Sequence, residues 1–316
     1  MADEEGITPV DSHQVAPMVR PSIPAADALI GVRKPVLQHG FVALVDYMGN
    51  DAAIVQAARV SYGLGTKSVR SDEALLRYLM RHHHTTPFEM VEFKFLVRLP
   101  IYVARQWIRH RTASVNEASA RYSIVPDEYE VPRPEAVRRQ DTQNRQGRSD
   151  EVLPPDEVAG FRKELQEVYD DAYGRYEAFL GLGVAREIAR IVLPVGFYTE
   201  WYWKINLHNL FHFLKLRMDP HAQEEIREYS AVMAEMVKTV VPVAYKAFED
   251  FDLNSETFSH RERRALAAIL RGTEERKACE EAGLPLVRPD GKPMKTGEGV
   301  EFLTKLARLR ALSKEP

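Results

Sequence analysis

The sequence predicts a fold of the α/β (α+β) class, with strands and helices interspersed along one chain. Residues 91–99 (VEFKFLVRL) and 197–205 (FYTEWYWKI) alternate apolar and polar side chains, as strands with one buried face do. Residues 41–46 (FVALVD) form a short apolar run typical of a buried strand. Longer segments place their apolar residues at helical spacing. The length of 316 residues allows one large domain or two small ones.

The charge balance and the single cysteine restrict the class of protein. Lys and Arg total 43 and Asp and Glu total 46, so the net charge of −3 provides no general field for nucleic acid. Cys279 is the only cysteine, which suits a reducing compartment. No stretch approaches the roughly 20 apolar residues of a membrane span, and the acidic N-terminus lacks the apolar core of a secretory signal. We expect a cytoplasmic protein that binds neither nucleic acid nor membranes.

The N-terminal part is expected to contain an extension, a strand and two helices. Residues 1–34 are rich in Pro and Ala, which predicts a partly disordered extension. After the strand at 41–46, Asp51 is expected to cap one helix, and Ser71 to cap another that ends near Arg81. The apolar stripe of the second helix consists of Leu75, Leu76, Leu79 and Met80.

The strand at 91–99 is the clearest element, and a helix is predicted directly after it. One face of the strand carries Val91, Phe93, Phe95, Val97 and Leu99, and the other carries Glu92, Lys94 and Arg98. Pro100 suits the first position of the next helix. On that helix Ile101, Ala104 and Ile108 share the apolar face, and Gln106 and Arg109 fall on a neighbouring face.

The second half of the chain is predicted to be mainly helical. Residues 131–156 contain four prolines and many charges, which indicates a loop insertion. Helices are expected at about 158–182, at 186–194 with Pro194 as the stop, at 207–217 with Asn206 as the cap, and at about 222–248. The stripe of the first of these holds Phe161, Leu165, Val168, Ala172, Tyr176 and Phe179. Residues 35–254 would form the main domain, and 255–316 a helical C-terminal extension.

The segment Arg109–Ser123 (RHRTASVNEASARYS) concentrates cations and hydrogen-bonding groups without any Gly or Pro. Arginine forks match phosphate oxygens in pairs, and hydroxyl groups complete such a site. In a slightly acidic protein, this cluster suggests a site for phosphorylated small molecules. The alternative is a solvated turn held by salt bridges, although Glu117 is the only acid in the segment.

Two groups of histidines could suggest a metal, but neither has a suitable pattern. His82, His83 and His84 are consecutive and cannot all face one ion. His208 and His212 have helical spacing, but Asn209 stands where a metalloprotease motif has its Glu. Glycine-rich phosphate loops and nucleophile elbows are also missing from the sequence. We therefore expect no metal site and no Rossmann or P-loop domain.

Six segments, in order, resemble the flavin-dependent thymidylate synthases. The signature of that family is similar to a pattern in this chain, in which Arg109-His110-Arg111 is followed by seven residues and then by Ser119. The six segments are QAARVSYG, HHHTTPFEM, VARQWIRHR, NEASARYS, REIARIVLP and FLKLRMDPHAQEEI, and the signature falls within the third and fourth of them. Together the similar segments span about residues 41–251.

The resemblance implies a fold, a reaction and an assembly. The fold would be of the family type, with a central mixed or antiparallel sheet flanked by long helices. The reaction would be the reductive methylation of dUMP to dTMP, with methylenetetrahydrofolate as carbon donor, NADPH as reductant and FAD as cofactor, yielding tetrahydrofolate. The protein would be a homotetramer with active sites between subunits. The family needs no cysteine nucleophile, which agrees with the charged surroundings of Cys279.

The resemblance also assigns site residues by position. Arg217 would be catalytic and face the uracil carbonyls, where a fixed cation stabilises developing negative charge. Residues implied to bind dUMP are Gln106, Arg109, Glu117, Ser119, Ala120, Arg121, Arg190 (from another subunit) and Arg217. Residues implied to bind FAD are Ser61, Thr86, Glu89, Arg109, His110, Arg111, Asn206, His208, His212 and His221. His84 and Tyr122 would lie on the folate and nicotinamide side of the flavin. In some relatives Asn replaces His212 and Arg replaces His208.

Two rival hypotheses remain open from the residues alone. One is a non-catalytic nucleotide- or RNA-binding module that uses the Arg109–Arg121 cluster, which a yellow, flavin-containing protein would contradict. The other is a histidine-based metal hydrolase, which a metal analysis of the purified protein would test.

Overall fold

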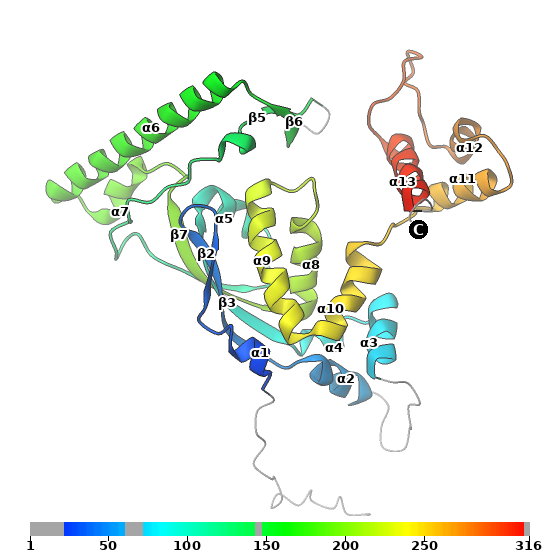
Figure 1. The fold of residues 1–316 in the computed structure, drawn as a ribbon, viewed down its shortest axis with the longest axis horizontal. Coiled ribbons are helices and arrows are strands. Elements are labelled where there is room, and N and C mark those ends of the chain that lie inside the picture. Colours follow the sequence, from blue (N-terminus) through cyan, green and yellow to red (C-terminus); the bar gives the residue numbers. More distant parts are fainter. Residues whose placement is uncertain (1–21, 61–71, 143–146, 313–316) are drawn as a thin grey trace, which may run out of the picture.

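The computed structural model describes residues 22–60, 72–142 and 147–312. A five-stranded sheet forms the centre of the molecule, with the order β1-β2-β3-β7-β4 (Figure 1). Its strands are β1 Arg33–Val36, β2 Gly40–Met48, β3 Glu92–Pro100, β7 Tyr198–Asn206 and β4 Ser114–Glu117. Every neighbouring pair is antiparallel. The central sheet is thus of the antiparallel kind, and the predicted α/β class is confirmed.

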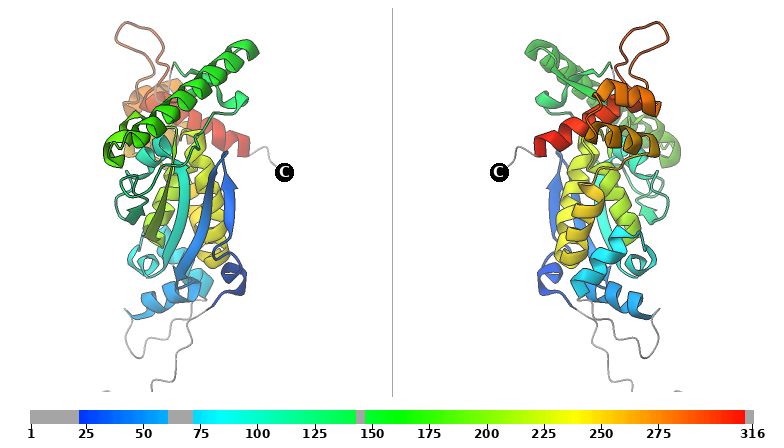
Figure 2. Two further views of the ribbon diagram at one scale, coloured as in Figure 1. Left: turned by 90° about the vertical axis from the view of Figure 1, so that its left-hand side faces the viewer. Right: turned by 90° about the vertical axis from the view of Figure 1, so that its right-hand side faces the viewer.

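Helices cover one face of this sheet and two further helical parts extend from it (Figures 1 and 2). The N-terminal helices are α1 Pro24–Asp27, α2 Asp51–Val60, α3 Asp72–Arg81, α4 Thr86–Glu89 and α5 Ile101–Trp107. The middle helices are α6 Pro155–Gly181, α7 Arg186–Ala189, α8 Leu207–Arg217, α9 Glu224–Val240 and α10 Pro242–Phe248. The C-terminal helices are α11 His260–Leu270, α12 Glu275–Ala282 and α13 Glu298–Leu312. Short 3₁₀ turns lie at Pro134–Ala136 and Arg190–Val192, and a π-turn at Glu249–Leu253.

Strand β3 confirms the predicted alternation. All five apolar side chains of its predicted inner face have no exposed surface, and the charged ones between them are partly exposed. Helices α8 and α9 lie against this inner face (Figure 2). Below the sheet, the predicted stripe of α3 is also buried. The main core therefore lies between one face of the sheet and the helices that follow it in sequence.

Asp51 does not cap the helix that it begins, contrary to the prediction. The side chain of Asn50 instead accepts a hydrogen bond from the backbone N–H of Ala53, at 3.2 Å. The two carboxylate oxygens of Asp51 accept hydrogen bonds from the N–H groups of Val243 (3.0 Å) and Ala244 (2.9 Å), at the start of α10. The sequence could not show this, because the helix that Asp51 caps begins almost two hundred residues later.

We expect Asp51→Ala to lower the free energy of unfolding by about 2 kcal/mol, because two N–H groups of α10 lose their acceptors. Asp51→Asn, which keeps one oxygen acceptor, should recover part of this loss. Urea unfolding followed by circular dichroism measures both variants. An unchanged midpoint for Asp51→Ala would contradict this structural role.

The chain after β3 also differs from its prediction. Pro100 ends strand β3 and precedes α5 instead of occupying its first position. The buried face of α5 consists of Val103, Ala104 and Trp107, whereas Ile108 is exposed. The predicted face shares only Ala104 with the observed one. Ile108 still donates a helical hydrogen bond to the carbonyl oxygen of Ala104, at 3.0 Å, but its side chain is 39% exposed.

The helix expected at about 222–248 is two helices. Helix α9 ends at Val240 and α10 begins at Pro242, which cannot donate the hydrogen bond that a continuous helix needs. The helix expected at 186–194 is shorter than predicted, because α7 covers only Arg186–Ala189 and a 3₁₀ turn follows at Arg190–Val192. Asn206 caps α8 through the N–H of Asn209, as predicted, and Leu207, Leu210, Phe211, Phe213 and Leu214 of this helix are buried.

Two segments expected to lack regular structure carry some. Residues 131–156 contain a 3₁₀ turn and an antiparallel hairpin of β5 Arg138–Gln140 and β6 Arg148–Val152. Within the expected N-terminal extension, the described residues from 22 onward form α1 and the start of edge strand β1. The predicted cap Ser71 lies outside the described residues.

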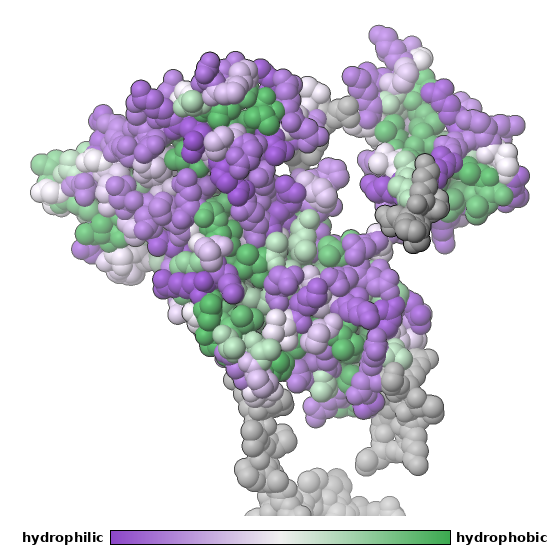
Figure 3. Space-filling view, in the orientation of Figure 1, coloured by the Kyte–Doolittle hydropathy of each residue, from purple (hydrophilic) through white to green (hydrophobic). Residues whose placement is uncertain are grey.

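Helix α6 is only partly covered by the rest of the chain, and it extends along one side of the molecule (Figure 1). Its buried side chains are Val158, Tyr169, Ala172 and Tyr176. The predicted stripe includes two of these residues, but it also includes Phe161, Val168 and Phe179, which are exposed by 44%, 55% and 38%. In Figure 3 green, hydrophobic surface lies near the two ends of α6, while most of the side turned to the viewer is hydrophilic. The apolar face of α6 is therefore wider than the surface that its own chain covers.

The C-terminal helices build a small core of their own. Its buried residues are Ala265, Ala268, Ala278, Cys279, Ala282, Leu284, Phe302 and Leu306. A capping box at Ser259 and Glu262 starts α11. Helix α12 ends at Ala282 and is followed by Gly283, whose positive φ of 75° suits glycine. In Figure 1 these helices stand beside the main body, joined to it by a narrow linker.

Candidate active site

The end of α5 and the end of α8 bring together residues that are about a hundred positions apart in sequence. Arg217, the last residue of α8, donates a hydrogen bond from Nε to Nε2 of His110, at 2.9 Å. His212, one turn earlier on α8, has its ring 5.9 Å from the ring of His110. The predicted catalytic arginine and two predicted FAD ligands therefore lie in one place.

The electrostatics of this pair follow from partial burial. Burial, together with smaller contributions from Arg217 and His212, lowers the pKa of His110 to about 4. The imidazole is therefore neutral near pH 7 and can accept the hydrogen bond of Arg217. Burial also lowers the pKa of Arg217, although a guanidinium remains protonated at neutral pH.

The groups beside this pair are free to bind an anionic, hydrogen-bonding molecule. The Oε1 atom of Gln106 is buried and has no hydrogen-bond partner in the structure. The side chains of Arg109 and Arg111 are exposed, and no carboxylate of the described residues forms an ion pair with either. An unpartnered buried acceptor beside unpaired cations fits a polar anion such as a nucleotide or a dinucleotide.

The loop that follows β4 places the predicted phosphate ligands next to α7. Ser119 Oγ accepts a hydrogen bond from the N–H of Arg121 at 3.3 Å, which closes the loop locally. Arg121 Nε donates to Glu187 at 3.0 Å, and Arg186 donates to the carbonyl oxygen of Tyr122 at 2.6 Å. Arg121 is thus held by a carboxylate, unlike the other two arginines of this segment. Ala120 lies between the two predicted phosphate ligands in the same loop.

Glu117 and Arg190 lie on two sides of this loop. Glu117 is the last residue of β4, and its carboxylate accepts a hydrogen bond from the hydroxyl group of Thr199 at 2.6 Å. This bond ties the loop to β7. Arg190 begins the 3₁₀ turn after α7. The side chain of Ile191, the next residue, is 74% exposed, so this turn lies at the surface.

The remaining predicted cofactor residues occupy α4, α8 and the loop after α8. Thr86 and Glu89 are the first and last residues of α4, which packs near α8. The ring of His84 lies 5.8 Å from that of Tyr78. His208 lies in the first turn of α8, after its cap Asn206. Ser61 lies outside the described residues.

Sequence reasoning missed the side chains that support the predicted ligands. Asp219 accepts a hydrogen bond from the N–H of His221 at 2.7 Å and contacts its Nδ1 at 2.8 Å. The carboxylate of Glu187 forms an ion pair with the guanidinium of Arg121, at 3.0 Å. A carboxylate two residues before a histidine could have indicated the first pair. No local pattern could indicate the second.

Comparison with known proteins decides the family. Residues 43–243 match the family model described as thymidylate synthase complementing protein. The flavin-dependent thymidylate synthase of Wolbachia pipientis is 54% identical over 246 residues, which cover 78% of this chain and 86% of that one. The enzyme of that name from Thermus thermophilus is 57% identical over 250 residues, which cover 79% and 90%. The chain belongs to the flavin-dependent thymidylate synthase family.

A solved structure supports the same assignment at the level of the fold. The UMP/dUMP methylase PolB from Streptomyces cacaoi, bound with 5-Br dUMP, superposes with a TM-score of 0.63 at 34% sequence identity. The match covers 71% of this chain and all of that chain. The family model ends at residue 243, so the C-terminal unit around α11–α13 lies beyond it.

Cys279 has no place in this family site. Its side chain is fully buried in the core of the C-terminal unit, and burial raises the pKa of its thiol. Among the described residues, no three His, Cys, Asp or Glu side chains are grouped so that they could hold a metal ion. In the described ranges, each helix is too short or too polar to traverse a lipid bilayer.

We expect Cys279→Ala to retain dTMP synthesis within about twofold of the unchanged protein, because a buried, protonated thiol cannot act as a nucleophile. The initial rate of dTMP formation is the measurement, with a thermal melt as the control for folding. Loss of the activity in a folded variant would contradict a reaction without a thiol.

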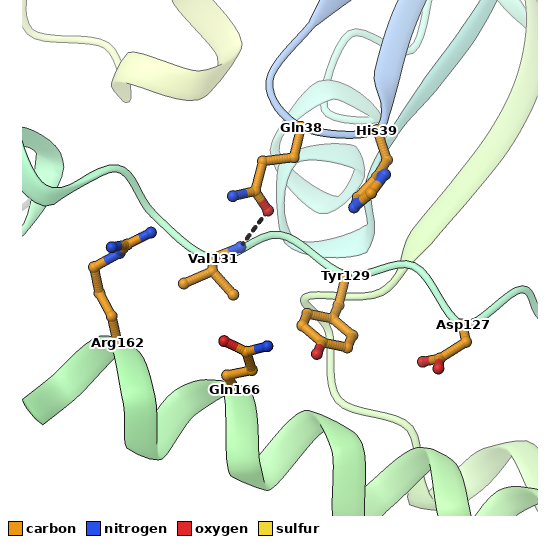
Figure 4. A pocket seen from close by; sticks show the side chains of 7 residues that line it. All are labelled: Gln38, His39, Asp127, Tyr129, Val131, Arg162 and Gln166. Carbon is orange, nitrogen blue, oxygen red and sulfur yellow. Dashed lines mark hydrogen bonds between the residues drawn. The ribbon is translucent and has the colours of Figure 1, made fainter. Parts of the chain in front are cut away.

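A hollow of the surface is lined by residues other than those of the family site. A polar cleft of about 260 Å³ separates the turn between β1 and β2 from helix α6. Figure 4 shows its lining residues, which are Gln38, His39, Asp127, Tyr129, Val131, Arg162 and Gln166. Gln38 accepts a hydrogen bond from the N–H of Val131 at 3.3 Å, which joins two of its walls. None of the predicted site residues lines this cleft.

Proposed function

We propose that this protein methylates dUMP to dTMP, with methylenetetrahydrofolate as the carbon donor, NADPH as the reductant and FAD as the cofactor. One observation carries the proposal in a chain of this family. It is the guanidinium of Arg217, which is partly buried, has no carboxylate partner among the described residues and is fixed beside the Arg109–Arg111 segment. This is the arrangement that a developing oxyanion on a pyrimidine needs.

In this proposal the residues divide into a phosphate end and a base end. Ser119 and Arg121 bind the phosphate of dUMP, together with Arg190 from another subunit. Gln106 contacts the nucleotide through its unpartnered Oε1, which can accept an N–H hydrogen bond of the pyrimidine. Arg217 donates to the pyrimidine oxygens. These oxygens gain negative charge when the ring carbon bonds to the one-carbon unit, so Arg217 stabilises the transition state more than the bound substrate.

The same region suits FAD. The cations Arg109 and Arg111 carry no ion pair among described side chains, and they are available for the two phosphates of the cofactor. Neutral and acidic contacts to FAD would come from Thr86, Glu89, Asn206 and the histidines of α8. When bound, FAD supplies the electron transfer that no side chain provides. His84 and Tyr122 would border the place where folate and nicotinamide enter.

We also infer a homotetramer in the cytoplasm. Part of the apolar face of α6, and apolar side chains near α7, are exposed in the single chain, and a second copy that covers them would bury Phe161, Val168 and Phe179. Ile191, next to Arg190, is exposed in the same way. An arginine at the edge of such an apolar surface can reach the substrate of a neighbouring subunit.

The test is dTMP formation by the purified protein, supplied with dUMP, methylenetetrahydrofolate, NADPH and FAD. A parallel reaction uses protein from which the flavin has been removed, without added FAD. We expect dTMP in the first reaction only. A folded, flavin-loaded protein that forms no dTMP would overturn the proposal and favour the non-catalytic nucleotide binder.

A further inference from the structure

Arg217 is held by a different kind of partner from most partly buried arginines of this chain. Arg98 is paired with Glu128, and Arg148 with Glu225. The partner of Arg217 is the imidazole of His110, which accepts its Nε–H at 2.9 Å. No carboxylate in the described ranges forms an ion pair with Arg217, and burial alone accounts for the lowered pKa of its guanidinium. The hydrogen bond to His110 therefore fixes the orientation of the Arg217 guanidinium, and no neighbouring negative charge of the described chain neutralises it.

The hydrogen bond requires a neutral imidazole. A guanidinium is protonated at all ordinary pH values, so Nε2 of His110 must offer a lone pair. Burial favours the uncharged imidazole, and the nearby Arg217 and His212 favour it further. A carboxylate in the place of His110 would also accept the bond, but it would place a negative charge against the guanidinium and weaken its attraction for a second anion.

The imidazole is itself fixed by aromatic packing. Its ring meets the ring of Phe213 edge-on, with centroids 4.9 Å apart and an interplanar angle of 76°. Phe213 has no exposed surface and packs against Trp107 at 4.7 Å and Trp203 at 5.0 Å. Both tryptophans belong to the buried core beneath the sheet. The buried core therefore fixes Phe213, Phe213 fixes the ring of His110, and His110 fixes the orientation of Arg217.

We propose that His110 is the positioning residue for Arg217. Its neutral imidazole fixes the guanidinium through Nε and leaves the positive charge and both Nη groups for the pyrimidine of the substrate. This inference rests on the proposed function, and it adds to the FAD contact that the family resemblance implies for His110. It makes His110 act on the transition state through another side chain.

Three variants of His110 separate positioning from other roles. His110→Gln keeps a neutral oxygen that can accept the bond, and it should retain kcat within about tenfold. His110→Phe keeps the ring but has no acceptor, and its kcat should fall about 10²-fold, as expected when a catalytic group is misplaced. His110→Glu accepts the bond but offsets the charge, so its kcat should fall at least as far as that of His110→Phe. All assays use saturating FAD, and thermal melts confirm folding.

A double-mutant cycle with Arg217→Ala is the decisive measurement. If His110 acts through Arg217, then adding His110→Phe to Arg217→Ala should change kcat and the Kd for dUMP by less than about twofold. Independent multiplication of the two losses would overturn the inference, and so would His110→Phe with the kcat of the unchanged protein. Flavin absorbance of each variant reports the cofactor contact separately. An unchanged protein that forms no dTMP would instead overturn the proposed function.

Discussion

Arg217→Ala should reduce dTMP synthesis by about 10² to 10³-fold, the range found when one fixed donor to a developing oxyanion is removed. The bound flavin should remain close to one equivalent per chain. The reason is the position of Arg217 at the end of α8, where its guanidinium is tied to His110 and has no carboxylate of the described chain to neutralise it. Its charge is therefore available for the substrate.

Two measurements on the purified variant check this prediction, namely the initial rate of dTMP formation and the flavin absorbance after gel filtration. The activity of Arg217→Lys should lie between those of Arg217→Ala and the unchanged protein, because a lysine keeps the charge but not the planar fork. Arg263→Ala, an exposed arginine of α11, is a matched control and should have no effect. Equal losses of flavin and of activity in Arg217→Ala would assign this arginine to the cofactor instead.

The parts of the fold that the sequence predicted are those governed by local periodicity. In β3, alternate side chains fall on opposite faces, so the pattern from Val91 to Leu99 is enough to identify the buried side. The stripe of α3 and the cap of α8 by Asn206 follow from spacing of three or four residues. These features depend on neighbours in sequence, and the structure confirms them.

The predictions that were wrong concern contacts between distant segments. Asp51 has the sequence context of a local cap, but its carboxylate is used by α10. Ile108 keeps the helical spacing of α5, but the packing of the other segments leaves its side chain exposed. Which side chain a distant segment will approach depends on the packing of the whole sheet and its helices, and one sequence does not contain that information in a local form.

In the candidate site, too, the sequence indicated which residues take part but not which distant residues contact one another. The resemblance supplied the residues, and the Arg109–Arg121 cluster was also visible from charge and composition. The geometry added what neither could supply, because the bond between Arg217 and His110 joins the ends of two helices from different halves of the chain. The carboxylates that hold Arg121 and His221 were likewise found only in the structure.

The second large expected effect concerns the exposed part of the apolar face of α6. We expect the double variant Phe161→Asp, Val168→Asp to dissociate the proposed tetramer into smaller species. The two side chains lie seven residues apart, so they share one face of the helix, and both are largely exposed in the single chain. Two buried carboxylates in an apolar contact between copies would be unpaired, which costs several kcal/mol for each ion.

The same variant should lose dTMP synthesis by at least about 10²-fold, because the proposed phosphate ligand Arg190 would no longer reach a neighbouring subunit. Sedimentation velocity measures the assembly, and the dTMP assay measures the activity. Lys163→Asp is a matched control, since it adds a carboxylate at an exposed position on the opposite side of α6 and should change neither. A double variant that remains tetrameric and fully active would exclude this face as the contact between subunits. Dissociation with full activity would show that each active site is complete within one chain, and would place Arg190 outside it.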